Sequence, residues 1–163
     1  MKRIWAPWRM EYIASEKQPG KGECFLCLEA GNDDAALVLV RKPAAFVIMN
    51  RYPYSNGHLM VAPDRHVSKI EDLTDVELLE MMSLVRTVSV VLREELSIDG
   101  LNVGINMGKA AGAGLEEHLH IHVVPRWFGD TNFMPVLGET KVISEHICET
   151  YNRLKGKLIE KIG

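Results

Sequence analysis

Hydrophobic residues over much of the chain fall into short runs that are typical of β-strands. The runs are rich in valine, isoleucine, leucine and methionine, and turn-forming glycine, proline and asparagine bound them. Runs of this length and composition predict strands rather than helices. The predicted strands cover residues 36–41, 45–50, 58–63, 101–106 and 118–124.

Two other stretches have helical spacing. Thr74 is followed three residues later by Glu77, a capping box that predicts the start of a long helix, and Gly100 follows its end. The apolar stripe of this helix is Leu78, Met82, Val85, Val88, Leu92 and Leu96. Ser144 is a candidate cap for a C-terminal helix whose stripe is Ile147, Tyr151, Leu154, Leu158 and Ile162. We therefore expect an α+β fold: an antiparallel meander sheet of about five strands, with one long inserted helix and a C-terminal helix.

Length and composition indicate a single domain. The chain has 163 residues, 47% of them hydrophobic, which is enough for one core over residues 24–163 after an irregular N-terminal arm at 1–23. The net charge of −3 gives no electrostatic reason to expect nucleic-acid binding. No apolar run is long enough to span a membrane or to form a signal peptide. An odd count of three cysteines fits the reducing cytoplasm better than a disulfide framework.

Three of the six histidines alternate with aliphatic residues in the stretch HLHIHVVP. These are His118, His120 and His122. Successive side chains of a strand point to opposite faces, so the three imidazoles share one face and the aliphatic side chains bury the other. Aligned imidazoles favour function over a merely polar surface. Two chemistries fit this row: chelation of a catalytic metal ion, or one nucleophilic histidine whose neighbours position the substrate.

A glycine-rich loop, NMGKAAGAGL at residues 106–115, lies directly before the histidine strand. Gly108, Gly112 and Gly114 let the backbone approach a ligand closely, and successive N–H groups can bind an anion. A loop of this kind is weak evidence on its own. Its position next to three histidines indicates phosphate chemistry.

These residues resemble the histidine-triad (HIT) superfamily of nucleotide hydrolases and transferases. The family motif His-φ-His-φ-His-φ-φ, with φ apolar, is matched by residues 118–124. Asn50, the Gly57–His58 pair and the sequence PDRH at 63–66 resemble upstream elements of the family. WAPWR near the N-terminus and PRWFGDTNF after the triad resemble a bacterial branch. That branch includes Fhit-like dinucleoside polyphosphate hydrolases and diadenosine tetraphosphate phosphorylases.

The resemblance implies a role for each histidine of the site. His120 would attack the α-phosphorus of a nucleotide and form a nucleotidyl-histidine intermediate. The backbone carbonyl of His118 would accept the Nδ1 proton of His120 and leave Nε2 unprotonated. His122 would donate a hydrogen bond to the phosphoryl or leaving-group oxygens, and His58 would support this network. A histidine at 122, where sugar-phosphate transferases of the family have glutamine, argues against a galactose-phosphate transferase.

The resemblance also implies the nucleotide contacts. Asn50 would bind the ribose hydroxyls, and Asn106 would lie beside the phosphates after a one-residue shift. Many relatives carry glutamine, serine or threonine shortly before the triad, whereas this chain has Gly114 followed by Leu-Glu-Glu at 115–117. Phosphate contacts would then come from backbone N–H groups of the loop, at Gly112 and Gly114. This departure leaves hydrolysis and phosphorolysis open.

Cys24 and Cys27 form a CxxC pair. A redox role would need a thioredoxin-like helix start, which the sequence lacks, and unligated thiols in a core are the other alternative. The resemblance implies structural zinc at Cys24, Cys27, His66 and His118. Four ligands leave no open position, so such a zinc would be structural and would leave His120 free.

We therefore expect a cytoplasmic enzyme that cleaves a dinucleoside polyphosphate, or a related AMP derivative, at the α-phosphate. The alternatives are a metal-dependent hydrolase that uses the triad as catalytic ligands, and a nucleotide-binding adaptor with little turnover. The resemblance implies a homodimer with Trp5, Trp8 and the long helix as candidate contacts. We expect a small-molecule nucleotide as substrate and neither nucleic acid nor membrane as a partner.

Overall fold

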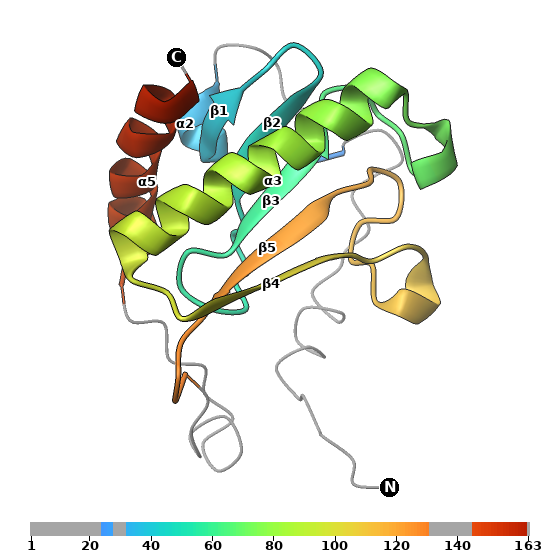
Figure 1. Cartoon of the computed structure of the whole chain (residues 1–163). Coiled ribbons are helices and arrows are strands. Elements are labelled where there is room, and N and C mark those ends of the chain that lie inside the picture. Colours follow the sequence, from blue (N-terminus) through green and yellow to red (C-terminus); the bar gives the residue numbers. More distant parts are fainter. Residues whose placement is uncertain (1–23, 28–31, 131–144, 163) are drawn as a thin grey trace, which may run out of the picture.

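The computed structural model describes residues 24–27, 32–130 and 145–162. The predicted arm at 1–23, with Trp5 and Trp8, and the predicted cap Ser144 lie outside these residues. The described residues form an antiparallel five-stranded sheet with two long helices packed on one face, as Figure 1 shows. The predicted α+β class is confirmed.

The sheet has the strand order β1-β2-β3-β5-β4. Its strands are β1 (Val38–Arg41), β2 (Ala45–Met49), β3 (Leu59–Pro63), β4 (Gly100–Ile105) and β5 (Ile121–Arg126). The order differs from that of a simple meander because β5 lies between β3 and β4. A central strand buries more surface than an edge strand, and β5 alternates buried with half-buried residues, whereas β4, with Gly104 and Asn102, is largely exposed.

The long helix α3 (Asp75–Leu96) begins at the predicted capping box. The Thr74 hydroxyl accepts a hydrogen bond from the Glu77 N–H, and the Glu77 carboxylate accepts one from the Thr74 N–H. The predicted stripe is wrong in its first turns, because Leu78 and Met82 are exposed. The buried face begins one residue earlier, at Glu77, since an ion pair with Arg65 fixes that side chain in the interior. The helix buries Glu77, Met81, Leu84, Val85, Val88, Val91 and Leu92.

The last helix, α5 (Ile147–Ile162), packs on α3 and β1. Its predicted residues Tyr151, Leu154 and Leu158 are buried, and Ile147 and Ile162 pack at the margin of the core. Short helices complete the fold: α2 (Asp33–Ala36) and the 3₁₀ turns η1 (Ile70–Asp72) and η2 (Lys109–Ala111). Among the described residues, no helix is both long and apolar enough to cross a membrane.

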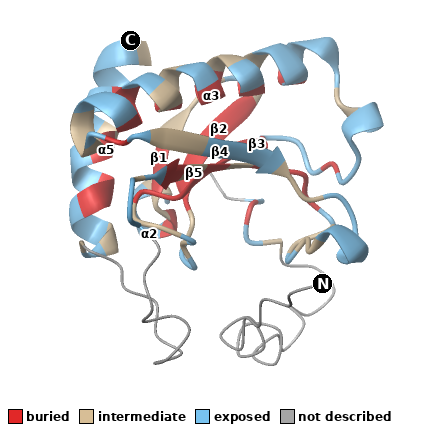
Figure 2. Ribbon diagram, turned by 60° about the horizontal axis from the view of Figure 1, so that its bottom comes forward, coloured by how far each residue is buried: buried red, intermediate tan, exposed pale blue. Residues whose placement is uncertain are grey.

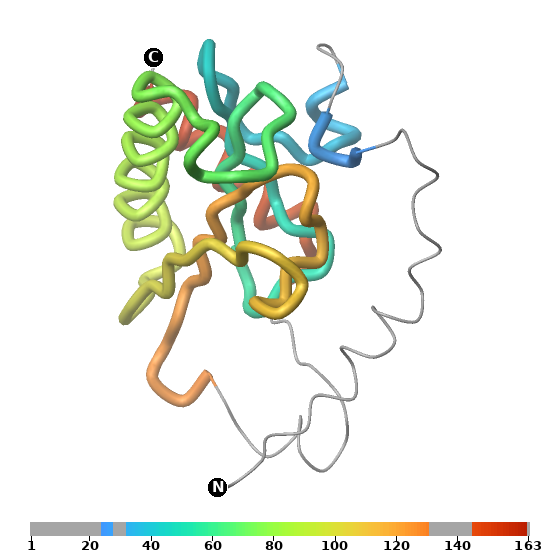
Figure 3. Tube along the Cα trace, turned by 90° about the vertical axis from the view of Figure 1, so that its right-hand side faces the viewer, coloured from blue at the N-terminus to red at the C-terminus, as the bar shows by residue number. Residues whose placement is uncertain are grey.

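The two faces of the sheet are covered differently. The main core lies between the sheet and helices α3 and α5, and Figure 2 shows the buried residues concentrated there. A smaller apolar cluster lies on the other face and includes Phe46, Ile48 and Met60. Seen from the side in Figure 3, α3 lies on one side of the sheet and the loop that contains η2 lies on the other. The face without long helices is therefore the one on which the histidines can meet a ligand.

Candidate functional site

The histidine row lies at the start of β5, on the face that α3 does not cover. Leu119, Ile121 and Val123 are buried in the main core. His122 lies opposite Gly104 of β4 and Met60 of β3, so the sheet positions it between two neighbouring strands. His118 and His120 precede the strand, which begins at Ile121 rather than at residue 118. Their exposed fractions are only 0% and 6%, so these two imidazoles are interior groups.

His120 is held in one tautomer by the backbone. Its Nδ1–H donates to the carbonyl oxygen of His118 at 2.9 Å. A carbonyl only accepts, so the proton of the neutral ring is on Nδ1 and Nε2 carries the lone pair. Burial lowers the pKa of His120, which keeps the ring neutral near pH 7. A buried neutral imidazole with an unprotonated Nε2 can act as a nucleophile.

His122 is held in the opposite tautomer through His58. The Tyr54 N–H donates to Nδ1 of His58 at 2.9 Å, so the proton of His58 is on Nε2. This Nε2 lies 3.0 Å from Nδ1 of His122 and donates to it. The neutral His122 ring therefore carries its own proton on Nε2. Burial and the neighbouring His120 lower the pKa of His122 to about 4, so it is a neutral donor over a wide pH range.

The rings of His120 and His122 are 4.8 Å apart between centroids and nearly perpendicular. One offers a lone pair at Nε2 and the other an N–H at Nε2. This complementary pair can attack an electrophilic centre and stabilise charge on an oxygen bonded to it.

The predicted nucleotide contacts are Asn50, Asn106, Gly112 and Gly114, and all four lie in loops that flank the strands of the site. The Asn50 oxygen accepts from the Tyr52 N–H at 2.8 Å, and its amide nitrogen lies 3.4 Å from Nδ1 of His58. Asn50 therefore supports the loop that orients His58. Asn106 follows β4 and lies beside His122. The turn η2 and Gly112, whose φ of +84° suits glycine, lie in the loop that leads to the histidines, as does exposed Gly114.

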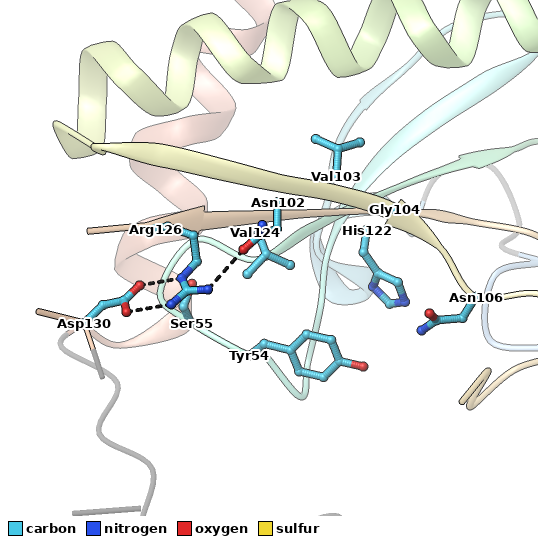
Figure 4. Close-up of a pocket in the computed structure, with 10 residues that line it drawn as sticks. All are labelled: Tyr54, Ser55, Asn102, Val103, Gly104, Asn106, His122, Val124, Arg126 and Asp130. Atoms are coloured by element: carbon cyan, nitrogen blue, oxygen red, sulfur yellow. Dashed lines mark hydrogen bonds and ion pairs between the residues drawn. The ribbon is translucent and has the colours of Figure 1, made fainter. Parts of the chain in front are cut away.

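A cavity of about 450 Å³ opens next to His122, as Figure 4 shows. It is lined by Tyr54, Ser55, Asn102, Val103, Gly104, Asn106, His122, Val124, Arg126 and Asp130. Of these, our sequence-based prediction included only Asn106 and His122. Continuing the alternation of β5 from His122 to Val124 and Arg126 indicates which side chains share that face. The contribution of Tyr54 and Asn102 depends on the pairing of distant segments, which no local pattern reveals.

A second cluster brings together the four predicted metal ligands. One ligand atom from each of Cys24, Cys27, His66 and His118 lies within 4.8 Å of the others. Sγ of Cys27 is 3.0 Å from Nδ1 of His66, and Sγ of Cys24 is 3.4 Å from Nδ1 of His118. Nε2 of His118 donates to the Pro63 carbonyl at 2.9 Å, so its lone pair on Nδ1 faces the sulfurs. These residues can hold a metal ion.

The electrostatics of the cluster also favour a cation. Burial and the adjacent Cys24 raise the pKa of the Cys27 thiol to about 11. Without a bound cation, thiolate charge at Cys27 is therefore disfavoured. A bound divalent cation would offset this cost, because it stabilises a coordinated thiolate directly.

Comparison with known proteins identifies the relatives of this chain. A Mycobacterium tuberculosis protein named "AP-4-A phosphorylase" is 40% identical over 157 residues, which cover 92% of this chain and 80% of that protein. "Bis(5'-adenosyl)-triphosphatase" of Dictyostelium discoideum is 37% identical over 82 residues, or 50% of this chain and 54% of that protein. A zinc-bound histidine-triad protein of Mycobacterium smegmatis superposes with a TM-score of 0.64 at 26% identity, over 77% of this chain and 86% of that one.

The family model of the HIT domain matches residues 32–129, which include the paired histidines and all five strands of the sheet. Together with the 40% identity to a relative over nearly the whole chain, this match means that the chain belongs to the HIT family.

Proposed function

We propose that this protein is an enzyme that cleaves a dinucleoside polyphosphate, or a related AMP derivative, at the α-phosphate through His120. The observation that carries the proposal is the hydrogen bond from His120 Nδ1 to the His118 carbonyl, which leaves a buried lone pair on Nε2. The M. tuberculosis relative is named for phosphorolysis and the D. discoideum relative for hydrolysis of such substrates. Both names describe transfer at a nucleotide phosphate.

In the proposed reaction, Nε2 of His120 attacks the α-phosphorus and forms an N–P bond. The bond between phosphorus and the bridging oxygen breaks, and its electron pair leaves with that oxygen. Nε2–H of His122 donates to this oxygen as negative charge develops on it. Water or inorganic phosphate then attacks the nucleotidyl-histidine and releases His120. Asn106 and the backbone at Gly112 and Gly114 are the proposed phosphate contacts, and Asn50 the proposed ribose contact.

We further propose that Zn²⁺ occupies the cluster of Cys24, Cys27, His66 and His118 and has a structural role. Two sulfur and two nitrogen ligands are typical of a closed tetrahedral zinc site. When bound, zinc would fix His118, whose carbonyl orients His120. Free thiols of this kind persist in the reducing cytoplasm, where we place the protein.

We also propose a homodimer. β4 is an edge strand of the sheet that the described residues form, so one side of its backbone can pair with a second copy. Val103 of β4 and Val76, Leu79 and Met82 of α3 are exposed apolar side chains. A dimer would bury such surface, and light scattering would then give twice the chain mass of 18.3 kDa.

Intact-mass analysis after brief mixing with diadenosine tetraphosphate tests the mechanism. We expect an adduct of one AMP on the wild type and none on His120→Ala, with turnover lost in that variant. ADP released only in the presence of phosphate indicates phosphorolysis, whereas AMP indicates hydrolysis. Wild-type turnover by a folded His120→Ala variant would contradict the mechanism. Rapid, reversible loss of activity with a chelator in a folded protein would instead favour the triad as a catalytic metal site.

A further inference from the structure

His58 and His122 form a hydrogen-bonded pair of imidazoles whose direction can in principle be reversed. Nε2 of His58 and Nδ1 of His122 are 3.0 Å apart, so one neutral ring donates to the other. If His58 donates, His122 keeps its own proton on Nε2. If His122 donates instead, its Nε2 carries a lone pair and cannot stabilise charge on an oxygen. The role of His122 as a donor therefore depends on a group that fixes the direction of the pair.

The N–H of Tyr54 distinguishes the two directions. It lies 2.9 Å from Nδ1 of His58 and can only donate, so it favours the arrangement in which the proton of His58 is on Nε2. The Asn50 amide nitrogen does not discriminate, because it lies 3.4 Å from one ring nitrogen of His58 and 3.5 Å from the other. The direction of the pair thus depends on where the Tyr54 peptide group lies.

Ser55, the next residue along the loop, fixes the position of this peptide group. Its hydroxyl donates to the Pro125 carbonyl of β5 at 2.6 Å, and its carbonyl accepts from the His58 N–H at 3.2 Å. Figure 4 shows Tyr54 and Ser55 on the side of β5 that His122 occupies, and all three residues line the same cavity. Ser55 therefore connects the loop both to His58 and to the strand that carries His122.

The hydroxyl of Ser55 attaches the loop where strand pairing has ended. The pairing of β3 with β5 stops at Leu59 and Val123, two residues before Pro125. The loop packs closely against β5 at this point, since a Cβ placed on Gly57 would lie 3.5 Å from Cγ of Pro125. Pro125 is a buried residue, and an unpaired carbonyl there would be unfavourable. The hydrogen bond from Ser55 is therefore a strong anchor for the loop.

We propose that Ser55 is a positioning residue for the reaction, an inference that rests on the proposed function. Its hydroxyl holds the Tyr54 N–H on Nδ1 of His58, and this contact keeps the proton of His122 on Nε2, towards the leaving oxygen. The role requires no contact between Ser55 and the substrate. Without the hydroxyl, the loop is released from β5, and the two directions of the imidazole pair are both populated.

NMR of the histidine rings in the full chain tests the link between Ser55 and His122, because protonated and unprotonated ring nitrogens have widely separated chemical shifts. We expect Nε2 of His122 to carry the proton in the wild type and in Ser55→Thr, which keeps the hydroxyl. In Ser55→Ala we expect this proton on Nε2 in less than about half of the molecules. Ser55→Cys, whose thiol is a weak donor, should change in the same direction and is the second variant if Ser55→Ala does not fold. His120 should keep its tautomer throughout, because the His118 carbonyl sets it.

Two AMP esters that differ only in the leaving group test the consequence for the reaction. They are adenosine 5'-(4-nitrophenyl phosphate) and adenosine 5'-(phenyl phosphate), and the more basic phenolate needs a donor more. We expect the ratio of kcat/KM for the nitrophenyl ester to that for the phenyl ester to rise by about tenfold in Ser55→Ala and to change by less than about twofold in Ser55→Thr. Ser89→Ala is the matched control and should leave the ratio unchanged, because the Ser89 hydroxyl donates to a backbone carbonyl at 2.7 Å within α3.

The outcomes separate this inference from the proposed function. A folded Ser55→Ala variant in which His122 keeps its proton on Nε2 overturns the inference and leaves the function intact. So does a variant that lowers kcat/KM for both esters equally, since Ser55 would then have a structural role alone. A Ser55→Thr variant that behaves like Ser55→Ala also overturns the inference, because the hydroxyl would not be the determinant. A wild-type protein that cleaves neither ester nor diadenosine tetraphosphate overturns the proposed function. Thermal melting of each variant checks that it is folded.

Discussion

The substitution Glu77→Gln tests whether the ion pair between Arg65 and Glu77 stabilises the loop that carries His66. Its carboxylate accepts from Nε and Nη2 of Arg65 at 2.9 and 2.8 Å, and from the N–H and hydroxyl of Thr74 at 2.7 and 2.9 Å. The hydrogen bond from Arg65 is the main reason that the pKa of Glu77 falls from 4.5 to about 2. Arg65 directly precedes His66, so this network ties the start of α3 to a candidate metal ligand.

The contribution of Glu77 to the free energy of unfolding, and the way it changes with pH, follow from this pKa. A fall from 4.5 to about 2 corresponds to about 3 kcal/mol between the two protonation states. The Arg65 side chain is 51% exposed, so solvent screens the pair and we expect Glu77→Gln to cost about 1–2 kcal/mol at pH 7. Because the folded pKa is the lower one, the stabilisation is complete above the unfolded pKa and is lost as the pH falls towards 2. Less than half of it remains at about pH 3.

Urea unfolding at pH 7 and pH 3, with a chelator present to exclude a contribution from metal, measures the difference in the free energy of unfolding between the wild type and Glu77→Gln. The control is Glu71→Gln, a surface carboxylate of η1 in the same region. We expect the free energy of unfolding of this control to differ from that of the wild type by less than about 0.5 kcal/mol at both pH values. A penalty for Glu77→Gln that is as large at pH 3 as at pH 7 would refute the electrostatic explanation.

Three further predictions follow from single contacts. Gly57→Ala should lower the free energy of unfolding by about 1–3 kcal/mol, because φ is +70° and the new Cβ would lie 2.6 Å from Cδ1 of Leu96; unchanged stability would show that the loop rearranges freely. Leu154→Ala should lower the free energy of unfolding in urea by about 2–5 kcal/mol, because Leu154 is fully buried. The exposed Ile159→Ala should lower it by less than about 0.5 kcal/mol, and equal losses in the two variants would contradict the packing of α5. Native mass spectrometry should find one zinc ion per wild-type chain and little in His66→Ala, and chelation should lower the Tm of the wild type only; zinc retained by the variant would refute the ligand set.

The sequence predicts local features of this molecule well because they depend on neighbours along the chain. Alternation in HLHIHVVP places Leu119, Ile121 and Val123 in the core, and the Thr74–Glu77 box marks the start of α3. The metal cluster was predicted from family resemblance, since its ligands are up to 94 positions apart. No periodicity along the chain could bring those four residues together.

Features that depend on competition between segments were not predicted. The order β3-β5-β4 depends on which of β4 and β5 buries more of its surface in the centre of the sheet. The order of the strands along the sequence does not show which of the two that is. The stripe of α3 was displaced because a charged residue, Glu77, takes a buried position that hydrophobicity alone assigns to Leu78. Most residues that line the cavity beside His122 were not predicted either, because they come from a loop and from two strands that meet only in the folded sheet.

The reactive nitrogen of each histidine in the site is set by backbone groups. A neutral imidazole has one N–H and one lone pair, and whichever nitrogen finds a carbonyl must keep the proton. The Pro63 carbonyl therefore directs the lone pair of His118 towards the cysteines, and the His118 carbonyl leaves the lone pair of His120 on Nε2. The Tyr54 N–H does the reverse, because it occupies the lone pair of His58 and so places a proton on Nε2 of His122. The three proposed roles of metal ligand, nucleophile and donor therefore rest on the backbone around three identical side chains, and the proposed chemistry depends on the positions of those peptide groups as much as on the histidines themselves.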